Sequence, residues 1–174
     1  VLFTGFYSDA WNVDAVLWFV HRIWPRLKAR RPGLTFYVVG PGPTAALRDL
    51  QRRDRSIVVT GAVPDVRPYL ARARVFVCPA RMGTGMRGKL LEAMASGVPV
   101  VSTTLGAEGI PIQMGDTGFL ADTEAIMASY IHLLLDDPAL HDSIAQNARA
   151  LVADQFSWAR GIDELEHLLQ HVRN

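Results

Sequence analysis

Residues 75–102, VFVCPARMGTGMRGKLLEAMASGVPVVS, decide how the chain folds. The apolar run at residues 75–78 predicts a buried strand, and residues 98–102 predict a second one. Between the two lie a glycine-rich turn and a segment long enough for a short helix. Neighbouring parallel strands are joined by a crossover of this kind, usually a helix. The stretch therefore predicts a strand–helix–strand unit of a parallel α/β fold.

The turn before the predicted helix has the composition of an anion site. Its glycines let the backbone approach a ligand without a Cβ in the way. The helix start presents unpaired N–H groups and the positive end of its dipole, which together attract phosphate. Arg87 and Lys89 add two cations there, and Glu92 can accept hydrogen bonds from sugar hydroxyls. The glycines alone could serve packing only, but the combination favours a phosphate-and-sugar site.

The rest of the chain alternates short apolar segments with helical ones. Further strands are predicted at residues 1–5, 34–39, 56–60 and 119–120. A first helix is predicted after Asn12 as its N-cap, with a bend at Pro25. Further helices are predicted at about residues 44–53, 66–73, 125–135, 139–155 and 158–172, the last capped by Ser157. This order predicts a Rossmann-like doubly wound parallel sheet of about six strands, with helices on both faces and at the C-terminal end.

In such sheets ligands bind outside the carboxyl ends of the strands. Four loops fall at those ends and should converge on one cleft: residues 5–11, 40–43, 61–65 and 80–88.

Bulk properties narrow the function classes. The 174 residues suit one domain, and a hydrophobic content of 49% with 20% charged residues is typical of a globular protein. A net charge of +1 gives no general attraction to nucleic acid. The single cysteine excludes an internal disulfide and suits the cytoplasm, and no apolar run approaches the ~20 residues of a membrane span. Because the sequence starts without Met inside a predicted strand, we expect a piece of a longer protein cut at a domain boundary.

Other candidate chemistries are weaker. His167 and His171 have a spacing that could hold a metal, but without a third ligand nearby a solvated helix face is favoured. Cys78 ends a buried strand and is interpreted as a core residue. The pair Asp136 and Asp137 precedes a proline and indicates a helix end. The chain has no Walker A pattern and no dinucleotide fingerprint, which disfavours a nicotinamide enzyme. The basic residues Lys28, Arg30 and Arg31 indicate solvated surface, with peripheral membrane contact as the alternative.

Residues 89–101, KLLEAMASGVPVV, resemble the donor-binding signature of the family 4 (group 1) retaining glycosyltransferases, and the resemblance spans nearly the whole chain. It implies the C-terminal half of the GT-B fold, with residues 1–174 as the nucleotide-sugar-binding domain and the acceptor domain absent. It also implies a nucleotide-diphosphate sugar as the substrate, no cofactor or metal, and a cytoplasmic role in polysaccharide biosynthesis. Alone, the domain would bind donor without transferring sugar.

The resemblance also assigns residues. Glu92 matches the second glutamate of a Glu-x7-Glu motif, which holds the ribose, whereas the first falls on Thr84, a departure near the donor sugar. Arg87 and Lys89 are expected to stabilise the leaving diphosphate. The remaining expected binding residues are Val63, Pro64, Gly83, Gly85, Met86, Gly88 and Leu90.

A second departure concerns two phosphate-binding cations. Where many family members carry an arginine and a lysine, this sequence has Phe6 and Trp11. Arg87 and Lys89 could replace those cations from the other side of the cleft; alternatively, the site has degenerated. The competing functions are therefore a non-catalytic nucleotide-binding module and a sugar-nucleotide epimerase or phosphorylase of the same fold.

Overall fold

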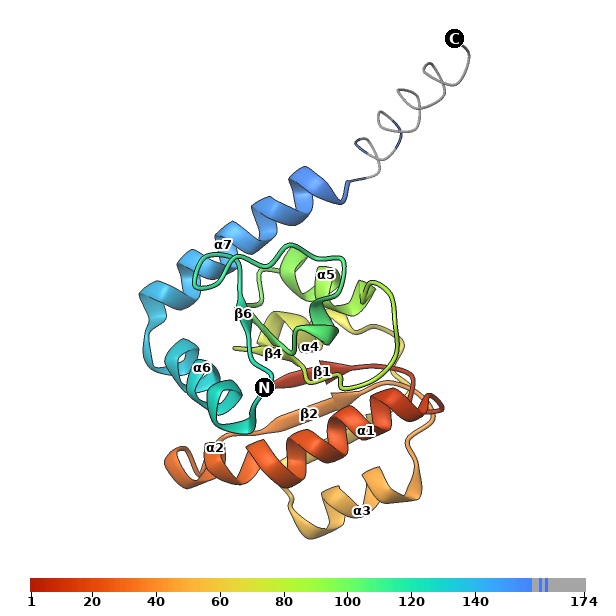
Figure 1. Cartoon of the computed structure of the whole chain (residues 1–174). Helices are drawn as coiled ribbons and strands as arrows, with labels where there is room; N and C mark the ends of the chain where they lie inside the picture. Colours follow the sequence, from red (N-terminus) through yellow and green to blue (C-terminus); the bar gives the residue numbers. More distant parts are fainter. Residues whose placement is uncertain (158–159, 161, 163–174) are drawn as a thin grey trace.

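The computed structural model describes residues 1–157, 160 and 162. Its centre is a parallel six-stranded sheet in the order β3-β2-β1-β4-β5-β6 (Figure 1). The strands are β1 (Leu2–Thr4), β2 (Phe36–Val39), β3 (Ile57–Gly61), β4 (Phe76–Cys78), β5 (Val100–Ser102) and β6 (Phe119–Leu120). The prediction of a Rossmann-like doubly wound sheet is confirmed, including the short sixth strand.

Helices cover both faces of the sheet. In Figure 1, α1 (Ala10–Trp18), α2 (Trp24–Arg30) and α3 (Ala45–Arg53) lie on one side of the sheet, and α4 (Arg67–Arg72) and α5 (Gly88–Ala95) lie on the other. After β5 come a short 3-10 turn, η2 (Leu105–Ala107), and then, after β6, α6 (Glu124–Asp136) and α7 (Pro138–Gln155). These bounds lie within about two residues of those predicted, except in the first helix.

The predicted first helix differs from the observed one at its start and in its middle. The observed helix begins at Ala10, with Asp9 in the N-cap position. Asn12 is therefore not the N-cap but lies inside α1. Between α1 and α2 the chain widens into a π-helix, η1 (Phe19–Ile23). Pro25 lies in the first turn of α2. Because proline lacks the N–H that would bond back four residues, regular α-helical hydrogen bonding is interrupted before it, where the structure has the wider η1 turn.

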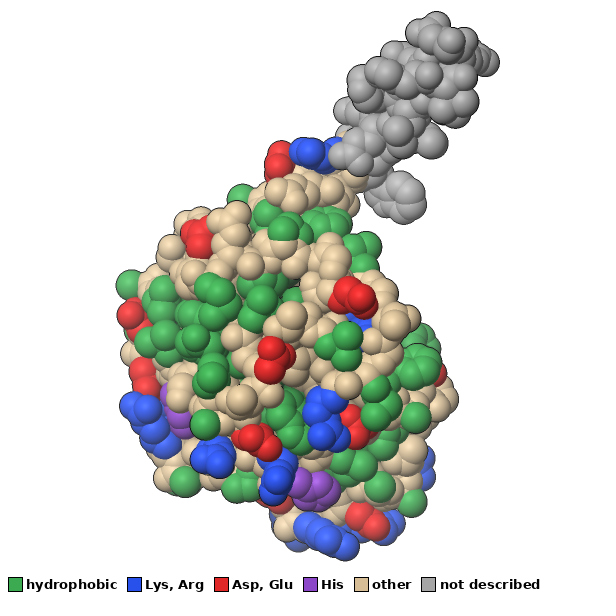
Figure 2. Space-filling model, viewed as in Figure 1, with side chains coloured by type: hydrophobic (Ala, Val, Ile, Leu, Met, Phe, Trp, Pro, Cys, Tyr) green, Lys and Arg blue, Asp and Glu red, His purple; other side chains and the backbone are tan. Residues whose placement is uncertain are grey.

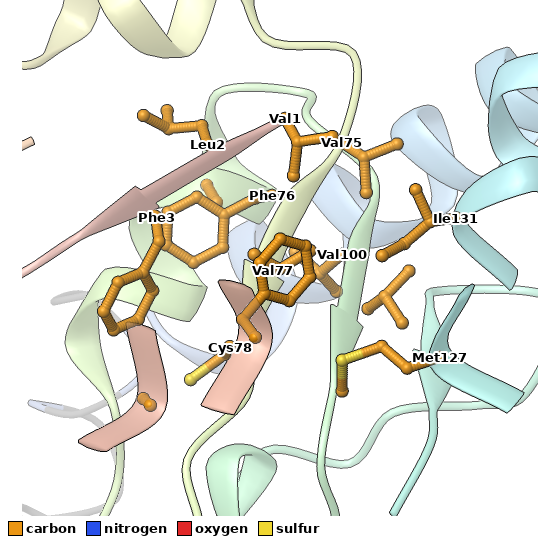
Figure 3. Close-up of a cluster of buried hydrophobic side chains, with 14 of the residues drawn as sticks. Val1, Leu2, Phe3, Val75, Phe76, Val77, Cys78, Val100, Met127 and Ile131 are labelled. Atoms are coloured by element: carbon orange, nitrogen blue, oxygen red, sulfur yellow. The ribbon is translucent and has the colours of Figure 1, made fainter. Parts of the chain in front are cut away.

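The hydrophobic core combines side chains of the central strands with those of the helices on both sides of the sheet. Figure 3 shows part of this cluster, including Phe3 of β1, Phe76 of β4, Val100 of β5, and Met127 and Ile131 of α6. All five side chains are buried, and burying each apolar side chain contributes about 1.5–3 kcal/mol. This packing fixes the spacing of the central strands and therefore of the loops at their carboxyl ends.

Asp136, Asp137 and the basic residues at the end of α2 form structural contacts. Asp137 caps α7, its side chain accepting a hydrogen bond from the Leu140 N–H at 3.0 Å. Asp136 pairs with Arg30 at 2.8 Å and with Arg31, which also holds its pKa below the usual range. The prediction of a helix end is confirmed. Figure 2 shows basic and acidic side chains interspersed on the face in view.

The histidines and Cys78 take structural positions. His132 and His141 are buried in helices, whereas His21 is exposed on η1. Cys78 is buried, and burial raises the pKa of its thiol, which agrees with a core role. The predicted helix at 158–172, with His167 and His171, lies outside the described residues.

In the part of the chain that the structure describes, no three His, Cys, Asp or Glu side chains are grouped to hold a metal. None of the helices described combines the length and apolar character that crossing a bilayer requires.

Candidate ligand-binding cleft

A cleft of about 620 Å³ lies at the carboxyl ends of the central strands. The strand order reverses beside β1, which has β2 on one side and β4 on the other, and this is where doubly wound sheets bind ligands. All four loops expected there contribute lining residues. The lining comprises Thr4, Gly5, Phe6, Asp9, Trp11, Asn12, Val39, Gly40, Pro41, Ala62, Val63, Val66, Met86, Arg87, Gly88, Lys89 and Glu92. The predicted convergence of these loops is confirmed.

Lys89 lies in the first turn of α5 with its ammonium held in the cleft. Its Nζ donates a hydrogen bond of 2.6 Å to Oδ1 of Asn12 and lies 4.4 Å from the centre of the Phe3 ring. A Cβ at Gly5 would come within 2.9 Å of the same Nζ, so a larger residue there would displace the end of the lysine side chain. Burial, more than any neighbouring charge, lowers the pKa of Lys89 from 10.5 to about 8. The ammonium is therefore poorly hydrated and available to an anion.

Arg87 precedes α5 and supports the glycine turn. Its guanidinium donates to the carbonyl oxygens of Thr84 at 3.0 Å and Met82 at 3.3 Å. The side chain therefore folds back under the turn, although it still lines the cleft. Of the two predicted cations, Lys89 is the one held toward the centre of the sheet edge, and Arg87 shapes the loop beside it.

The glycine turn is also held by Glu108, a residue that no pattern in the sequence singles out. Oε2 of Glu108 accepts a hydrogen bond of 2.6 Å from the Gly85 N–H. Gly83 and Gly85 have φ angles of 89° and 85°, a region that favours glycine. The conformation of this turn is thus set by two glycines and by contacts from Arg87 and Glu108.

The other predicted binding residues divide into two groups. Glu92 is exposed at the cleft, and Val63, Met86 and Gly88 also line it. The remaining residues, Pro64, Gly83, Thr84, Gly85 and Leu90, lie outside the lining. Leu90 is fully buried in the core, where its side chain packs the helix instead of facing a ligand.

Phe6 and Trp11 form an aromatic part of the cleft wall. Their exposed fractions are 65% and 43%, unusually high for such large side chains, and both line the cleft. Asp9, between them in sequence, lines it too. The charged lining residues are thus two cations, Arg87 and Lys89, and two carboxylates, Asp9 and Glu92.

These features define a Rossmann-like α/β domain with a cleft at the switch point of the sheet. The family pattern described as "Glycosyl transferases group 1" matches residues 1–137. The chain belongs to this family.

Two curated relatives illustrate the match. The chain is 31% identical over 163 residues to a putative colanic acid biosynthesis glycosyltransferase, WcaL, of Salmonella typhimurium, covering 84% of this chain and 40% of WcaL. It is 40% identical over 111 residues to O-antigen chain mannosyltransferase B of Escherichia coli, covering 61% of this chain and 28% of the relative. The chain thus spans less than half the length of these relatives.

Solved structures share the fold. The C-terminal domain of LpcC, a group 1 family glycosyl transferase from Francisella tularensis, superimposes with a TM-score of 0.73 at 21% identity, covering 90% of this chain and 86% of that one. HepE of Anabaena in complex with UDP gives 0.78 at 20% identity, covering 98% of this chain and 48% of that one. A point mutant of TarM from S. aureus, solved with UDP among its ligands, gives a TM-score of 0.80 at 16% identity, covering 96% of this chain and 34% of that one.

Proposed function

We propose that this chain is the donor-binding domain of a retaining glycosyltransferase of family 4 and that its cleft binds a nucleotide-diphosphate sugar. The observation that carries the proposal is that α5 brings its own N-terminus, the Lys89 ammonium and the Glu92 carboxylate to one cleft. Phosphate suits the first two groups, and sugar hydroxyls suit the third. The UDP complexes of proteins with the same fold support this choice.

The role of the site in transfer is to stabilise the leaving group. Breaking the bond between the sugar and the diphosphate leaves negative charge on the phosphate oxygens. The N–H groups at the start of α5 and the Lys89 ammonium are fixed before the reaction, so they stabilise that charge without reorganising. Arg87 adds positive charge while it holds the turn. Since the protein supplies these cations, we expect transfer to need no metal.

The rest of the donor would lie along the cleft. Glu92, on the exposed side of α5, would accept hydrogen bonds from the ribose, and Val63 would contact the base. The acceptor would be bound by an N-terminal domain of the full-length protein. Because nucleotide sugars are cytoplasmic metabolites, we place the reaction there.

A second candidate is a nucleotide-binding module without transfer activity. It is favoured by Phe6 and Trp11, which give one wall of the cleft an aromatic surface instead of cations. The full-length protein separates the two candidates. A transferase gives a glycoside whose anomeric configuration, read by NMR, matches that of the donor, whereas a module leaves the donor unchanged.

Donor binding is tested by thermal shift and calorimetry with UDP-, GDP- and ADP-glucose. At least one should stabilise the chain, and Glu92→Ala should weaken its binding by about 1.5–3 kcal/mol, the range for hydrogen bonds to a charged group. Inorganic pyrophosphate, which has no hydroxyls of this kind, should bind the variant as it binds the parent. The control is Glu124→Ala, because Glu124 is an acid on α6 outside the cleft lining. Equal losses for both ligands would show that Glu92 only supports the helix, and no binding of any nucleotide sugar would refute the donor site.

A further inference from the structure

Asn12 joins two parts of the cleft that are far apart in sequence. Its side chain is 6% exposed, although the residue lies in the first turns of α1 beside the cleft. Its Nδ2 donates a hydrogen bond of 2.8 Å to the Phe6 carbonyl, and its Oδ1 accepts the 2.6 Å hydrogen bond from Lys89. One amide thus connects the loop after β1 with the start of α5.

An amide is an unusual sole hydrogen-bond partner for a partly buried ammonium, because charges removed from water are generally paired. Among the described residues no carboxylate forms an ion pair with Lys89. The other ionisable groups that act on it are Cys78 of β4, Arg87 before α5 and Asp9 of the β1–α1 loop. The Cys78 thiol is buried with a raised pKa, so it is neutral near pH 7 and gives no counter-charge. Asp9 is the one carboxylate among these groups, and its effect is the smallest of them, so an external anion would add to a weak counter-charge.

We propose that Asn12 is a positioning residue whose amide fixes the Lys89 ammonium to the β1–α1 loop, so that the two residues form one pH-dependent anion-binding unit in the cleft. This inference rests on the proposed function only for the identity of the natural ligand, the diphosphate of the donor. The binding of an anion by Lys89 and Asn12 does not depend on it. The amide accepts from the ammonium without neutralising it, whereas a carboxylate at this position would cancel the charge offered to phosphate. Its N–H donation to Phe6 keeps the amide oxygen turned toward Lys89.

The pH dependence follows from the state of Lys89. With its pKa at about 8, the free chain loses the ammonium as the pH rises above 8. A bound anion favours the charged form and therefore raises this pKa. By linkage, anion binding should weaken as the pH increases through 8.

The sequence makes the direct measurement simple, because it contains only two lysines, Lys28 and Lys89. NMR of the chain labelled at the lysine ε-carbon should give two signals, which Lys28→Arg assigns. The titration midpoint of Lys89 is then followed in the parent, in Asn12→Asp and in Asn12→Leu. The control is Asn147→Ala, because Asn147 bonds Asp116 on the surface, outside the cleft lining.

We expect Asn12→Asp to raise the midpoint of Lys89 by about one unit or more, as an adjacent opposite charge does. Asn12→Leu should lower it, and Asn147→Ala should leave it unchanged. Sulfate, compared with chloride at equal ionic strength, serves as the anion because its charge is constant over this range. Sulfate should raise the midpoint in the parent and in Asn147→Ala, and should do so much less in both Asn12 variants.

Midpoints that agree in the parent and the two Asn12 variants would overturn the proposal, as would an equal response to sulfate in all of them. If Asn12→Leu does not fold, Asn12→Asp decides alone. These outcomes are separate from the nucleotide-sugar panel. A response to sulfate through Asn12 without binding of any nucleotide sugar would keep this inference and reject the donor assignment.

Discussion

Lys89 shows how a single residue can weaken the fold at a site where we propose that it binds a ligand. Its pKa is lower in the folded chain, at about 8, than its ordinary value of 10.5. The unfolded chain therefore binds the proton more tightly, so this residue destabilises the fold fully below pH 8. The penalty fades as the pH rises from 8 to 10.5. Such a conflict between stability and function is common at binding sites.

We predict that Lys89→Met stabilises the chain at pH 7 by about 1–2 kcal/mol and removes most of its affinity for anions. Methionine keeps the buried stem but has no charge to desolvate. Denaturant unfolding at pH 7 and pH 10 measures the effect, and the gain should shrink at the higher pH. A variant that is less stable than the parent at pH 7 would show that the ammonium contributes to the fold.

Glu108 is the second residue whose role can be isolated. We predict that Glu108→Ala makes hydrogen exchange of the Gly85 amide about tenfold faster, the equivalent of losing one hydrogen bond to a charged group. Glu108→Gln, which keeps an acceptor oxygen, should lie between this variant and the parent. The measurement is residue-resolved exchange by NMR, with Glu92→Ala as the control. Unchanged exchange at Gly85 would mean that the turn is held without Glu108.

At the scale of elements, the sequence predicted the strands better than the details of the first helix. Short apolar runs between glycines and prolines mark each strand locally, so their existence needs no tertiary information. Asp9 and Asn12 both belong to residue types that are good N-caps. The side chain of Asn12 instead bonds Lys89, which is 77 residues away. The contact of Glu108 with Gly85 is equally non-local, across 23 residues. Local sequence patterns cannot predict either of these long-range contacts.

The junction between α6 and α7 gives an element-scale prediction. Asp137 ends α6 and caps α7, with Pro138 at the first position of the second helix. We predict that Asp137→Ala costs about 1 kcal/mol of stability, whereas Asp137→Asn, which can still accept from the Leu140 N–H, costs much less. Thermal unfolding of the two variants measures the difference. Equal losses would assign the effect to charge and not to capping.

At the scale of the whole molecule, the sequence predicted the position of the cleft but not all of the side chains that line it. Parallel topology sends all four loops to the same edge, and this needed only the order of the elements. The side chains that line it depended on packing. Leu90, expected at the ligand, is drawn into the core as part of the apolar face of α5, and Asn12, expected to cap a helix, lines the cleft.

The extent of the chain leads to the remaining prediction. The chain covers less than half the length of each of the two relatives described above. We propose that the acceptor is bound by another part of the full-length protein. We therefore expect the 174-residue chain to bind a nucleotide sugar without transferring it. Calorimetry measures the binding, and mass spectrometry of the donor with a panel of acceptors measures the transfer. Turnover to a defined acceptor by the purified chain would contradict this.

The lining of the cleft comes from four separate segments: Phe6 to Asn12 from the loop after β1, Val39 to Pro41 at the end of β2, Ala62 to Val66 after β3, and Met86 to Glu92 at the start of α5. No two of these segments are neighbours along the chain, and each lies at the end of a different strand or just beyond it. A loop exchange can therefore replace one segment while the others keep their sequence, provided that Asn12 is retained for Lys89. Evolution could vary the ligand in the same piecewise way, since rigid scaffolds tolerate change in the loops they carry.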